Sequence, residues 1–208
     1  MKRICIFCGS NSGTLKEYSL AAEACGRLLA KRGLTLVYGG GNVGLMGILA
    51  DAVLEAGGEV IGVIPRKLIE KEVAHHGISS LIPVDTMHER KFRMAELADA
   101  FVALPGGIGT MEELFEAFTW SQLGFHTKPV GLLNTAGFYE PLLAFLRQME
   151  QQRFLKPEHL ETLLVHHEFE ALLDKLADSK PSGEGKWIDK APTLPASGLN
   201  EFNGTINR

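Results

Sequence analysis

The residues best suited to chemistry lie in the stretch 104–113, which reads LPGGIGTMEE. The run 99–104 predicts a buried strand before the glycines, and apolar side chains at helical spacing up to Leu123 predict a helix after them. Side chains do not screen the backbone N–H groups of such a turn, and the start of a helix adds a partial positive charge. The stretch lacks the Gly-Lys-Ser/Thr ending of a Walker loop but still predicts a phosphate site. The residues expected to hold the phosphate are Gly106, Gly107, Gly109 and Thr110.

The same stretch allows a purely structural interpretation. Thr110-x-x-Glu113 fits a capping box, in which Thr110 is the N-cap and Glu113 reaches back from the third helical position. A cap needs one suitable residue and no glycine loop before it. The glycines therefore favour the phosphate interpretation.

A charged cluster opens the helix expected over residues 87–97 and includes Arg90 and Lys91. A solvated helix face would explain such a cluster in most proteins. However, adjacent cations near a helix N-terminus oppose the helix dipole, and a bound phosphate would offset that cost. The cluster follows the strand expected over 81–84, which places it on the ligand side of a parallel sheet.

Three motifs resemble one known family. Residues 105–113 resemble the PGGxGTxxE signature of the Lonely Guy (LOG) family, the cytokinin riboside 5′-monophosphate phosphoribohydrolases. The segments 39–47 and 87–91 resemble two further motifs in the family's order, so the resemblance runs from about residue 2 to about residue 176. It implies that Arg90 and Glu113 are the catalytic pair and that Lys91 contacts substrate. The substrate-binding residues expected from the motifs and the strand ends are Ser10, Gly41, Asn42, Arg90, Lys91, Gly106, Gly107, Ile108, Gly109, Thr110 and Glu112.

The resemblance implies hydrolysis of the N-glycosidic bond of N6-modified adenosine 5′-monophosphates, which releases a free base and ribose 5-phosphate without a cofactor or metal. Cleavage of that bond develops oxocarbenium character on the sugar, and the Glu113 carboxylate would stabilise this charge or orient the attacking water. Arg90 would grip the phosphate or assist departure of the base. The pocket for the N6 substituent is built by tertiary packing, so the sequence leaves the preferred base open.

Strands and helices alternate along the chain. Strands are expected at 3–8, 34–38, 59–64, 81–84, 99–104, 128–133 and 163–165, with helices between them. This alternation predicts an α/β fold, a Rossmann-like open parallel sheet with helices on both faces, as a single domain. Because ligands bind beyond the carboxyl ends of such strands, Ser10, the loop at Gly39 and the loop at Gly106 should converge on one crevice.

Composition limits the class of protein. At 208 residues and 45% hydrophobic content, the chain suggests one domain over 1–178, followed by a tail over 179–208 that is rich in Pro, Gly and Ser and expected to be poorly ordered. A net charge of −4 gives no reason to expect nucleic acid or an anionic membrane as partner. No apolar run reaches the length of a membrane span and residues 1–30 lack the layout of a signal peptide, so we expect a cytoplasmic enzyme.

The resemblance implies a homodimer. The apolar residues Phe118, Trp120 and Leu123 at the end of the Glu113 helix suggest that the dimer buries this helix together with part of the helix over 139–152.

Other motifs are weaker. Residues 39–44 fit GxGxxG, but the loop follows the second strand and the next strand ends in Pro65-Arg66 rather than an acid, which argues against NAD. Cys5-x-x-Cys8 lies inside a strand, where positions three apart face opposite ways, so buried thiols are expected rather than a redox pair. The seven histidines show no metal-ligand spacing.

Two other functions are the alternatives to this hydrolase. A nucleotide carrier of the same fold would keep the glycine loops without needing both Arg90 and Glu113. An amino-acid decarboxylase would need a lysine that holds PLP as a Schiff base, and no such lysine is identifiable.

Overall fold

A parallel β-sheet forms the centre of the protein. The computed structural model describes residues 1–70 and 73–179, so the predicted tail lies outside the described residues apart from Ser179. Within that part of the chain the sheet has seven strands in the order β4-β3-β2-β1-β5-β6-β7. The strands are β1 (Arg3–Phe7), β2 (Thr35–Tyr38), β3 (Val60–Pro65), β4 (Ser80–Val84), β5 (Ala100–Ala103), β6 (Val130–Leu133) and β7 (Leu163–His166).

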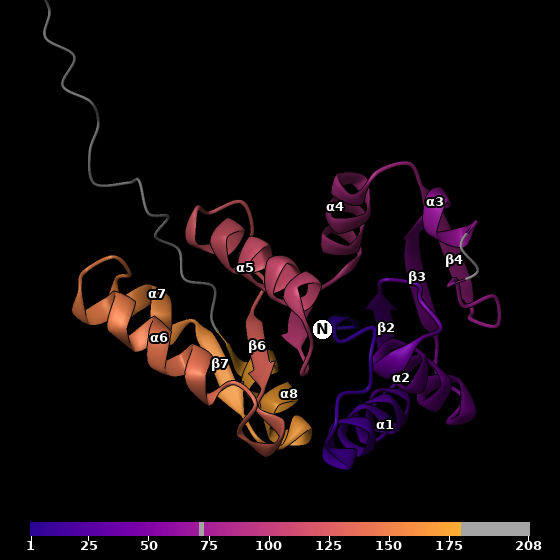
Figure 1. Ribbon diagram of the computed structural model, residues 1–208, viewed down its shortest axis with the longest axis horizontal. Helices are drawn as coiled ribbons and strands as arrows, with labels where there is room; N and C mark the ends of the chain where they lie inside the picture. Colours follow the sequence, from indigo (N-terminus) through magenta and orange to yellow (C-terminus); the bar gives the residue numbers. More distant parts are fainter. Residues whose placement is uncertain (71–72, 180–208) are drawn as a thin grey trace, which may run out of the picture.

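Helices cover both faces of the sheet (Figure 1). One face packs against α1 (Lys16–Lys31), α2 (Gly44–Glu55) and α8 (Phe169–Asp178). The other packs against α4 (Met87–Leu97), α5 (Ile108–Gln122) and α6 (Glu140–Gln151). Shorter helices are α3 (Arg66–Ile69), α7 (Pro157–Glu161) and the 3-10 turn Thr135–Gly137. The predicted fold class, an open parallel sheet with helices on both faces, is confirmed.

The apolar core lies in two layers, one on each side of the sheet. Along β1 the side chains alternate, so Ile4 and Ile6 belong to one layer while Cys5 and Phe7 belong to the other. Cys8 lies in the opposite layer from Cys5, and both thiols are free and buried. Burial raises the pKa of each thiol, which keeps them neutral. The expectation of buried thiols on opposite faces is confirmed.

The strand order reverses between β1 and β5. From β1 the chain builds β2, β3 and β4 on one side, and it then crosses to place β5, β6 and β7 on the other. The loops that leave these two central strands therefore diverge from a shared point, and Gly9 N donates to the Pro105 carbonyl at 3.1 Å across it. Such a switch point at the carboxyl ends is where open α/β sheets bind ligands.

Local predictions differ from the structure in a few places. The helix after the glycine loop begins at Ile108, with Gly107 as an N-cap that makes no side-chain bond, and not after Thr110. The 3-10 turn and α7 were not predicted because neither is long enough to show a periodic apolar pattern. No helix in residues 1–70 and 73–179 combines the length and apolar composition that a membrane crossing requires.

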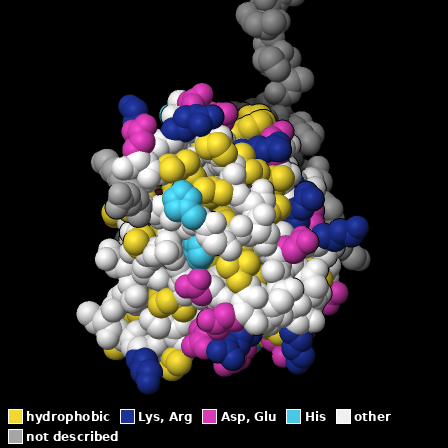
Figure 2. Space-filling view, turned by 90° about the vertical axis from the view of Figure 1, so that its right-hand side faces the viewer, with side chains coloured by type: hydrophobic (Ala, Val, Ile, Leu, Met, Phe, Trp, Pro, Cys, Tyr) yellow, Lys and Arg dark blue, Asp and Glu magenta, His cyan; other side chains and the backbone are white. Residues whose placement is uncertain are grey.

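One face of the molecule carries charges of both signs. On the face that Figure 2 shows, acidic and basic side chains are interspersed among apolar ones. A nucleic-acid-binding face instead gathers Lys and Arg into a patch or stripe. This face has no such stripe.

Candidate active site

A cavity of about 370 Å³ lies at the carboxyl ends of the strands. The loops after β1, β2 and β5 line it, together with the first turns of α4 and α5. The predicted crevice is therefore present, and it collects most of the predicted residues. Those that line it are Ser10, Gly41, Arg90, Gly107, Ile108, Gly109, Thr110, Glu112 and Glu113.

Arg90 and Glu113 form an ion pair inside this cavity. Arg90 Nη2 lies 3.2 Å from Glu113 Oε1, and each side chain is 10% exposed. The capping-box interpretation of Thr110 and Glu113 is therefore wrong. Because α5 begins at Ile108, Thr110 lies within its first turn and Glu113 lies beyond the capping positions, so the carboxylate is free to face α4.

The Glu113 carboxyl is in an unusual electrostatic environment. Burial raises the pKa of Glu113, the charge of Arg90 lowers it, and the nearby Glu112 raises it again, so the net shift is upward. A buried carboxyl with a raised pKa and one charged partner, lying in a cleft, is typical of a functional site.

Arg90 is held closely by the backbone of the loop after β2. A Cβ atom placed on Gly39 would come within 2.0 Å of Arg90 Nη2. Arg90 Nη1 also contacts the Met87 sulfur at 3.7 Å. Arg90 Nε is buried and has no hydrogen-bond partner among the described residues. Since a buried charged donor is costly without an acceptor, this atom indicates a place for a ligand oxygen or nitrogen.

The glycine loop is open on its cavity side. A Cβ atom on Gly107 or Gly109 would meet no atom within 4 Å. Gly106 is different, because a Cβ there would lie 2.1 Å from the Thr110 hydroxyl oxygen. Thr110 itself is only 4% exposed. Thr110 thus packs against Gly106, and the first amides of α5 receive no side-chain cap from Gly107. Free helix-start amides with no side chain in front of them suit an anion.

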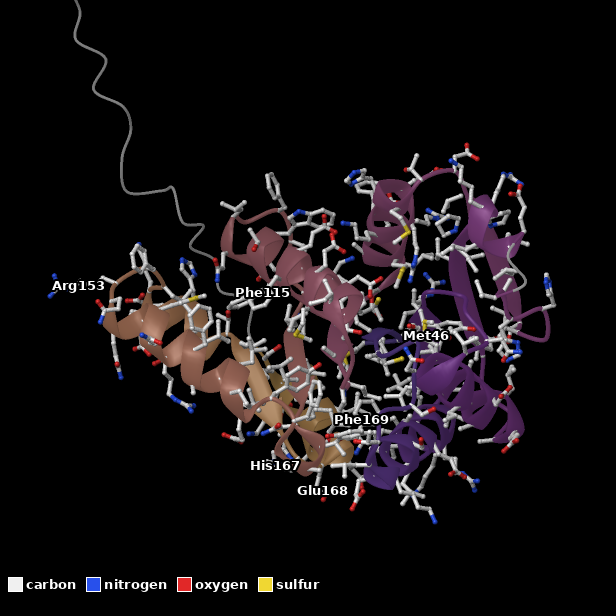
Figure 3. The ribbon with its side chains drawn as sticks, viewed as in Figure 1. Met46, Phe115, Arg153, His167, Glu168 and Phe169 are labelled. Atoms are coloured by element: carbon white, nitrogen blue, oxygen red, sulfur yellow. The ribbon has the colours of Figure 1, made fainter. Side chains whose placement is uncertain are left out.

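Apolar side chains complete the lining of the cavity. They come from α2, α3, the segment before β4 and the start of α4, and they are Val43, Met46, Leu68, Val73 and Met87. Met46, labelled in Figure 3, lies near the middle of the molecule. An antiparallel bridge between Gly41 and Ala74 holds this side together, and Asn42 N donates to the Val73 carbonyl at 2.8 Å. The lining of the cavity therefore combines charged groups with apolar side chains, and the two meet where Met87 contacts Arg90.

Three predicted residues do not line the cavity. Asn42 is exposed, and Gly106 lines a smaller neighbouring cavity. Lys91 is 8% exposed and its Nζ pairs with Glu112 and, at 3.1 Å, with Glu116. Burial alone would lower the pKa of Lys91, but the hydrogen bonds to the two carboxylates raise it. Lys91 thus reaches the cavity only through Glu112.

Sequence reasoning placed the loop at Gly39 in the crevice but missed the contact of Gly39 with Arg90, and it missed the apolar side chains of the cavity lining. Gly39 opens the glycine run, but its proximity to Arg90 depends on how α4 packs against the sheet. Val43, Met46 and Val73 carry no chemical signal in the sequence because they look like ordinary core residues. Among the described residues no group of three or more His, Cys, Asp or Glu is arranged to hold a metal ion.

Comparison with known proteins gives a consistent result. Residues 46–176 match a family model described as possible lysine decarboxylase. The chain is 48% identical over 184 residues to cytokinin riboside 5′-monophosphate phosphoribohydrolase LOG5 of Arabidopsis thaliana, covering 88% of this chain and 81% of that protein. It is 46% identical over 205 residues to the probable enzyme of the same name, LOGL3, of Oryza sativa subsp. japonica, covering 99% and 93%. The molybdenum cofactor carrier protein of Chlamydomonas reinhardtii has the same fold, with a TM-score of 0.66 at 21% identity over 86% of this chain and 99% of that one.

Proposed function

Since this chain belongs to the LOG family of cytokinin riboside 5′-monophosphate phosphoribohydrolases, we propose that it hydrolyses the N-glycosidic bond of N6-modified adenosine 5′-monophosphates. The products are the free base, a cytokinin or adenine, and ribose 5-phosphate. The observation that carries this proposal is the buried Arg90–Glu113 pair, which lies in one cavity with the open glycine loop.

The phosphate binds to the amides at the start of α5, from Gly107 to Thr110, where the helix dipole favours an anion. The ribose then lies beside Glu113, one turn further along the same helix. The carboxylate stabilises the oxocarbenium-like sugar or orients the attacking water. The unpaired Nε of Arg90 donates either to the phosphate or to the departing base.

The base packs against the apolar side chains of the cavity lining. Met46, Val73 and Met87 offer an apolar surface suited to a purine and to an apolar N6 substituent. The polar groups thus fix the ribose phosphate, while packing against apolar side chains discriminates among bases.

A direct test uses AMP, GMP, CMP, isopentenyl-AMP and adenosine, with release of free base as the measurement. We expect base release from AMP or isopentenyl-AMP. Adenosine should be a far poorer substrate, because it lacks the charged group that the loop binds. Its activation free energy, as kcat/KM reports it, should be higher by roughly several kcal/mol. Equal turnover of adenosine and AMP would contradict the phosphate assignment. Binding of AMP without release of any base would favour the carrier alternative.

The decarboxylase description of the family model does not fit the cavity. A PLP enzyme holds its cofactor through a lysine, and among the described residues that line the cavity there is none. Lys91, the nearest candidate by sequence, is engaged with Glu112 and Glu116.

We also propose a homodimer, a cytoplasmic location, and a single catalytic domain over residues 1–178. The dimer proposal is supported by an apolar surface where α4 meets the end of α5, with Phe92 57% exposed and Phe125 74% exposed beside Trp120. Phe118, which we expected to contribute to this surface, is instead 4% exposed and packs in the core of its own chain.

A further inference from the structure

The turn between β6 and α6 contacts the strand end that leads into the glycine loop. Tyr139 immediately precedes α6 and is 1% exposed. Its hydroxyl donates a 2.6 Å hydrogen bond to the carbonyl oxygen of Leu104. Leu104 is the residue before Pro105 and the loop glycines. A side chain 35 positions away in the sequence therefore touches the first peptide of the loop.

That carbonyl oxygen is the only hydrogen-bonding group on the Leu104–Pro105 peptide, because a proline nitrogen carries no hydrogen. It also lies one residue beyond Ala103, the last residue of β5 that pairs with β6. The sheet ladder therefore does not fix the plane of this peptide. Leu104 is fully buried, so the oxygen has no access to water and needs a protein donor.

The next peptide plane is fixed in the same way. The Pro105 carbonyl accepts the hydrogen bond from Gly9 N, and no peptide bond among the described residues is cis. In a trans peptide the N–H points away from the carbonyl, so the Gly106 N–H faces away from Gly9. Two carbonyl bonds, from Tyr139 and from Gly9, thus set the direction of the loop that follows.

Tyr139 is itself held by a hydrogen-bond network centred on the buried Asn134. Its N–H donates to Asn134 Oδ1 at 2.8 Å, and Asn134 is fully buried. Asn134 Nδ2 donates to Glu140 at 2.7 Å, and His167 Nδ1 donates to the Asn134 carbonyl at 2.9 Å. The turn keeps Ala136 at a φ of 51°, in the left-handed region that alanine rarely adopts. Such strain persists only where surrounding contacts enforce it.

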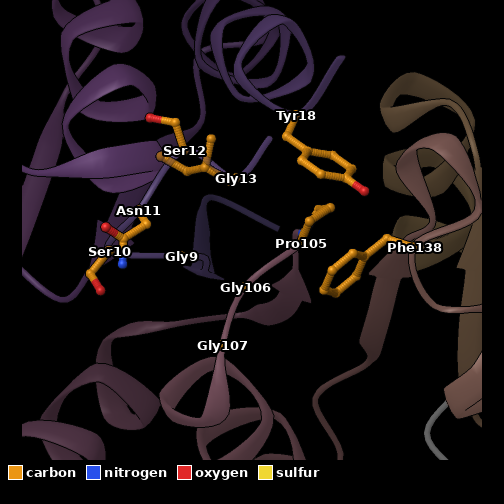
Figure 4. A pocket seen from close by; sticks show the side chains of 11 residues that line it. Gly9, Ser10, Asn11, Ser12, Gly13, Tyr18, Pro105, Gly106, Gly107 and Phe138 are labelled. Carbon is orange, nitrogen blue, oxygen red and sulfur yellow. The ribbon is translucent and has the colours of Figure 1, made fainter. Parts of the chain in front are cut away.

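The same turn also lies beside the loop glycines. Phe138 packs edge-to-face on Tyr18, with ring centroids 5.7 Å apart, and lines a cavity of about 230 Å³ with Gly106 and Gly107 (Figure 4). The β6–α6 turn therefore also reaches Gly106 and Gly107 through this second cavity.

We propose that Tyr139 is a positioning residue of the phosphate site: through the Leu104 carbonyl it sets the course of the chain that presents the amides from Gly107 to Thr110. This inference rests on the proposed function, since it assigns the phosphate to that loop. Burial raises the pKa of the Tyr139 hydroxyl, so it remains a donor throughout the neutral range.

The test is Tyr139→Phe, which removes the hydroxyl and keeps the ring. The matched control is Tyr18→Phe, since the Tyr18 ring packs on the same turn but its hydroxyl makes no hydrogen bond within the described part of the chain. Calorimetry would measure the binding of ribose 5-phosphate and of adenine to each protein. We expect Tyr139→Phe to bind ribose 5-phosphate about tenfold more weakly and adenine unchanged, which corresponds to one lost hydrogen bond. The kcat/KM for AMP should fall mainly through KM, and Tyr18→Phe should behave as the wild type.

The possible outcomes are distinct. Unchanged ribose 5-phosphate binding in Tyr139→Phe would overturn the inference, and so would an equal loss of ribose 5-phosphate and adenine binding, which would indicate general loosening of the fold. A wild-type protein that binds ribose 5-phosphate but releases no base would refute the proposed function. A selective effect of Tyr139→Phe on ribose 5-phosphate would still support positioning in that case. A wild type that binds no ribose 5-phosphate overturns both.

Discussion

At the scale of single residues, Arg90 and Glu113 are two opposite charges with little access to water. A buried ion pair contributes little net stability, because desolvation of both groups offsets their attraction. Each charge therefore has a cost that the fold alone does not explain. The unpaired Arg90 Nε and the raised pKa of Glu113 indicate that the pair is arranged for a ligand.

Glu113→Gln separates the electrostatic role of the carboxylate from its shape. The amide keeps the size of the side chain and an oxygen that can accept from Arg90, so the variant should fold and bind AMP. Loss of one charge-stabilising group typically lowers kcat by about a hundredfold or more. Melting temperature, AMP affinity and base release would be measured together, with Glu23→Gln in the exposed Arg27 pair as control. A folded variant with near-wild-type turnover would return Glu113 to a structural role.

The acid limb of the pH profile should belong to Glu113. The active form is the carboxylate, so activity is present above its pKa and is lost as the pH falls through it. Because the pKa is raised, this loss should occur at a higher pH than for an ordinary carboxyl. The phosphate group of AMP, like other phosphate monoesters, has a second pKa of about 6, so it contributes an acid limb of its own. The residual activity of Glu113→Gln would be measured against pH. If its acid limb is unchanged, the whole limb belongs to the substrate.

At the scale of elements, the site depends on how α4 approaches the loop after β2. Arg90 lies near the start of α4, and its guanidinium rests directly on the backbone of Gly39. Thr86 caps α4 by accepting from Glu89 N at 3.1 Å, which fixes where the helix begins. The contact between helix and loop then decides where the guanidinium lies relative to Glu113 on α5.

Gly39→Ala should disable the site without unfolding the protein. The added Cβ would clash with Arg90 Nη2, the end of a flexible side chain, so Arg90 moves and the backbone does not. A displacement of about 1 Å in a catalytic group can lower the rate about a hundredfold, and we expect a loss in kcat/KM of that order. The control is Gly77→Ala, whose Cβ would come no closer than 3.3 Å to His75. Normal activity in Gly39→Ala would show that the position of Arg90 is not critical.

At the scale of the whole molecule, the surface between α4 and the end of α5 carries two aromatic side chains that its own chain leaves exposed. Both helices carry site residues on their inner side, while Phe92 and Phe125 remain exposed on the outer side. Large exposed aromatic side chains that lie together are typical of an interaction surface. A homodimer formed there would stabilise the helices that hold Arg90 and Glu113.

Light scattering at micromolar concentration should give twice the chain mass of 22.7 kDa. The double variant Phe92→Glu, Phe125→Glu should give a monomer, because charges in place of the aromatic rings oppose burial of this surface. Leu20→Glu is the control, since Leu20 is 51% exposed on α1, across the sheet. A monomeric wild type would contradict the dimer, and a dimeric double variant would place the interface elsewhere.

The sequence by itself determined the sheet, its helices and the glycine loop between β5 and α5. These follow from local patterns, since apolar periodicity defines each element and alternating strands and helices permit few topologies. The same reasoning correctly placed Cys5 and Cys8 on opposite faces and brought Ser10, the loop at Gly39 and the loop at Gly106 into one crevice.

The family resemblance implied that Arg90 and Glu113 act as a pair, but only the tertiary structure shows how the side chains meet inside that crevice. Glu113 fits a helix cap by spacing, but the register of α5 and its packing beside α4 give it Arg90 as partner. The same packing turns Lys91 toward Glu112 and Glu116 and places Gly39 under Arg90. These contacts join segments far apart in the chain, so their geometry depends on helix packing and buried volume, which no local pattern encodes.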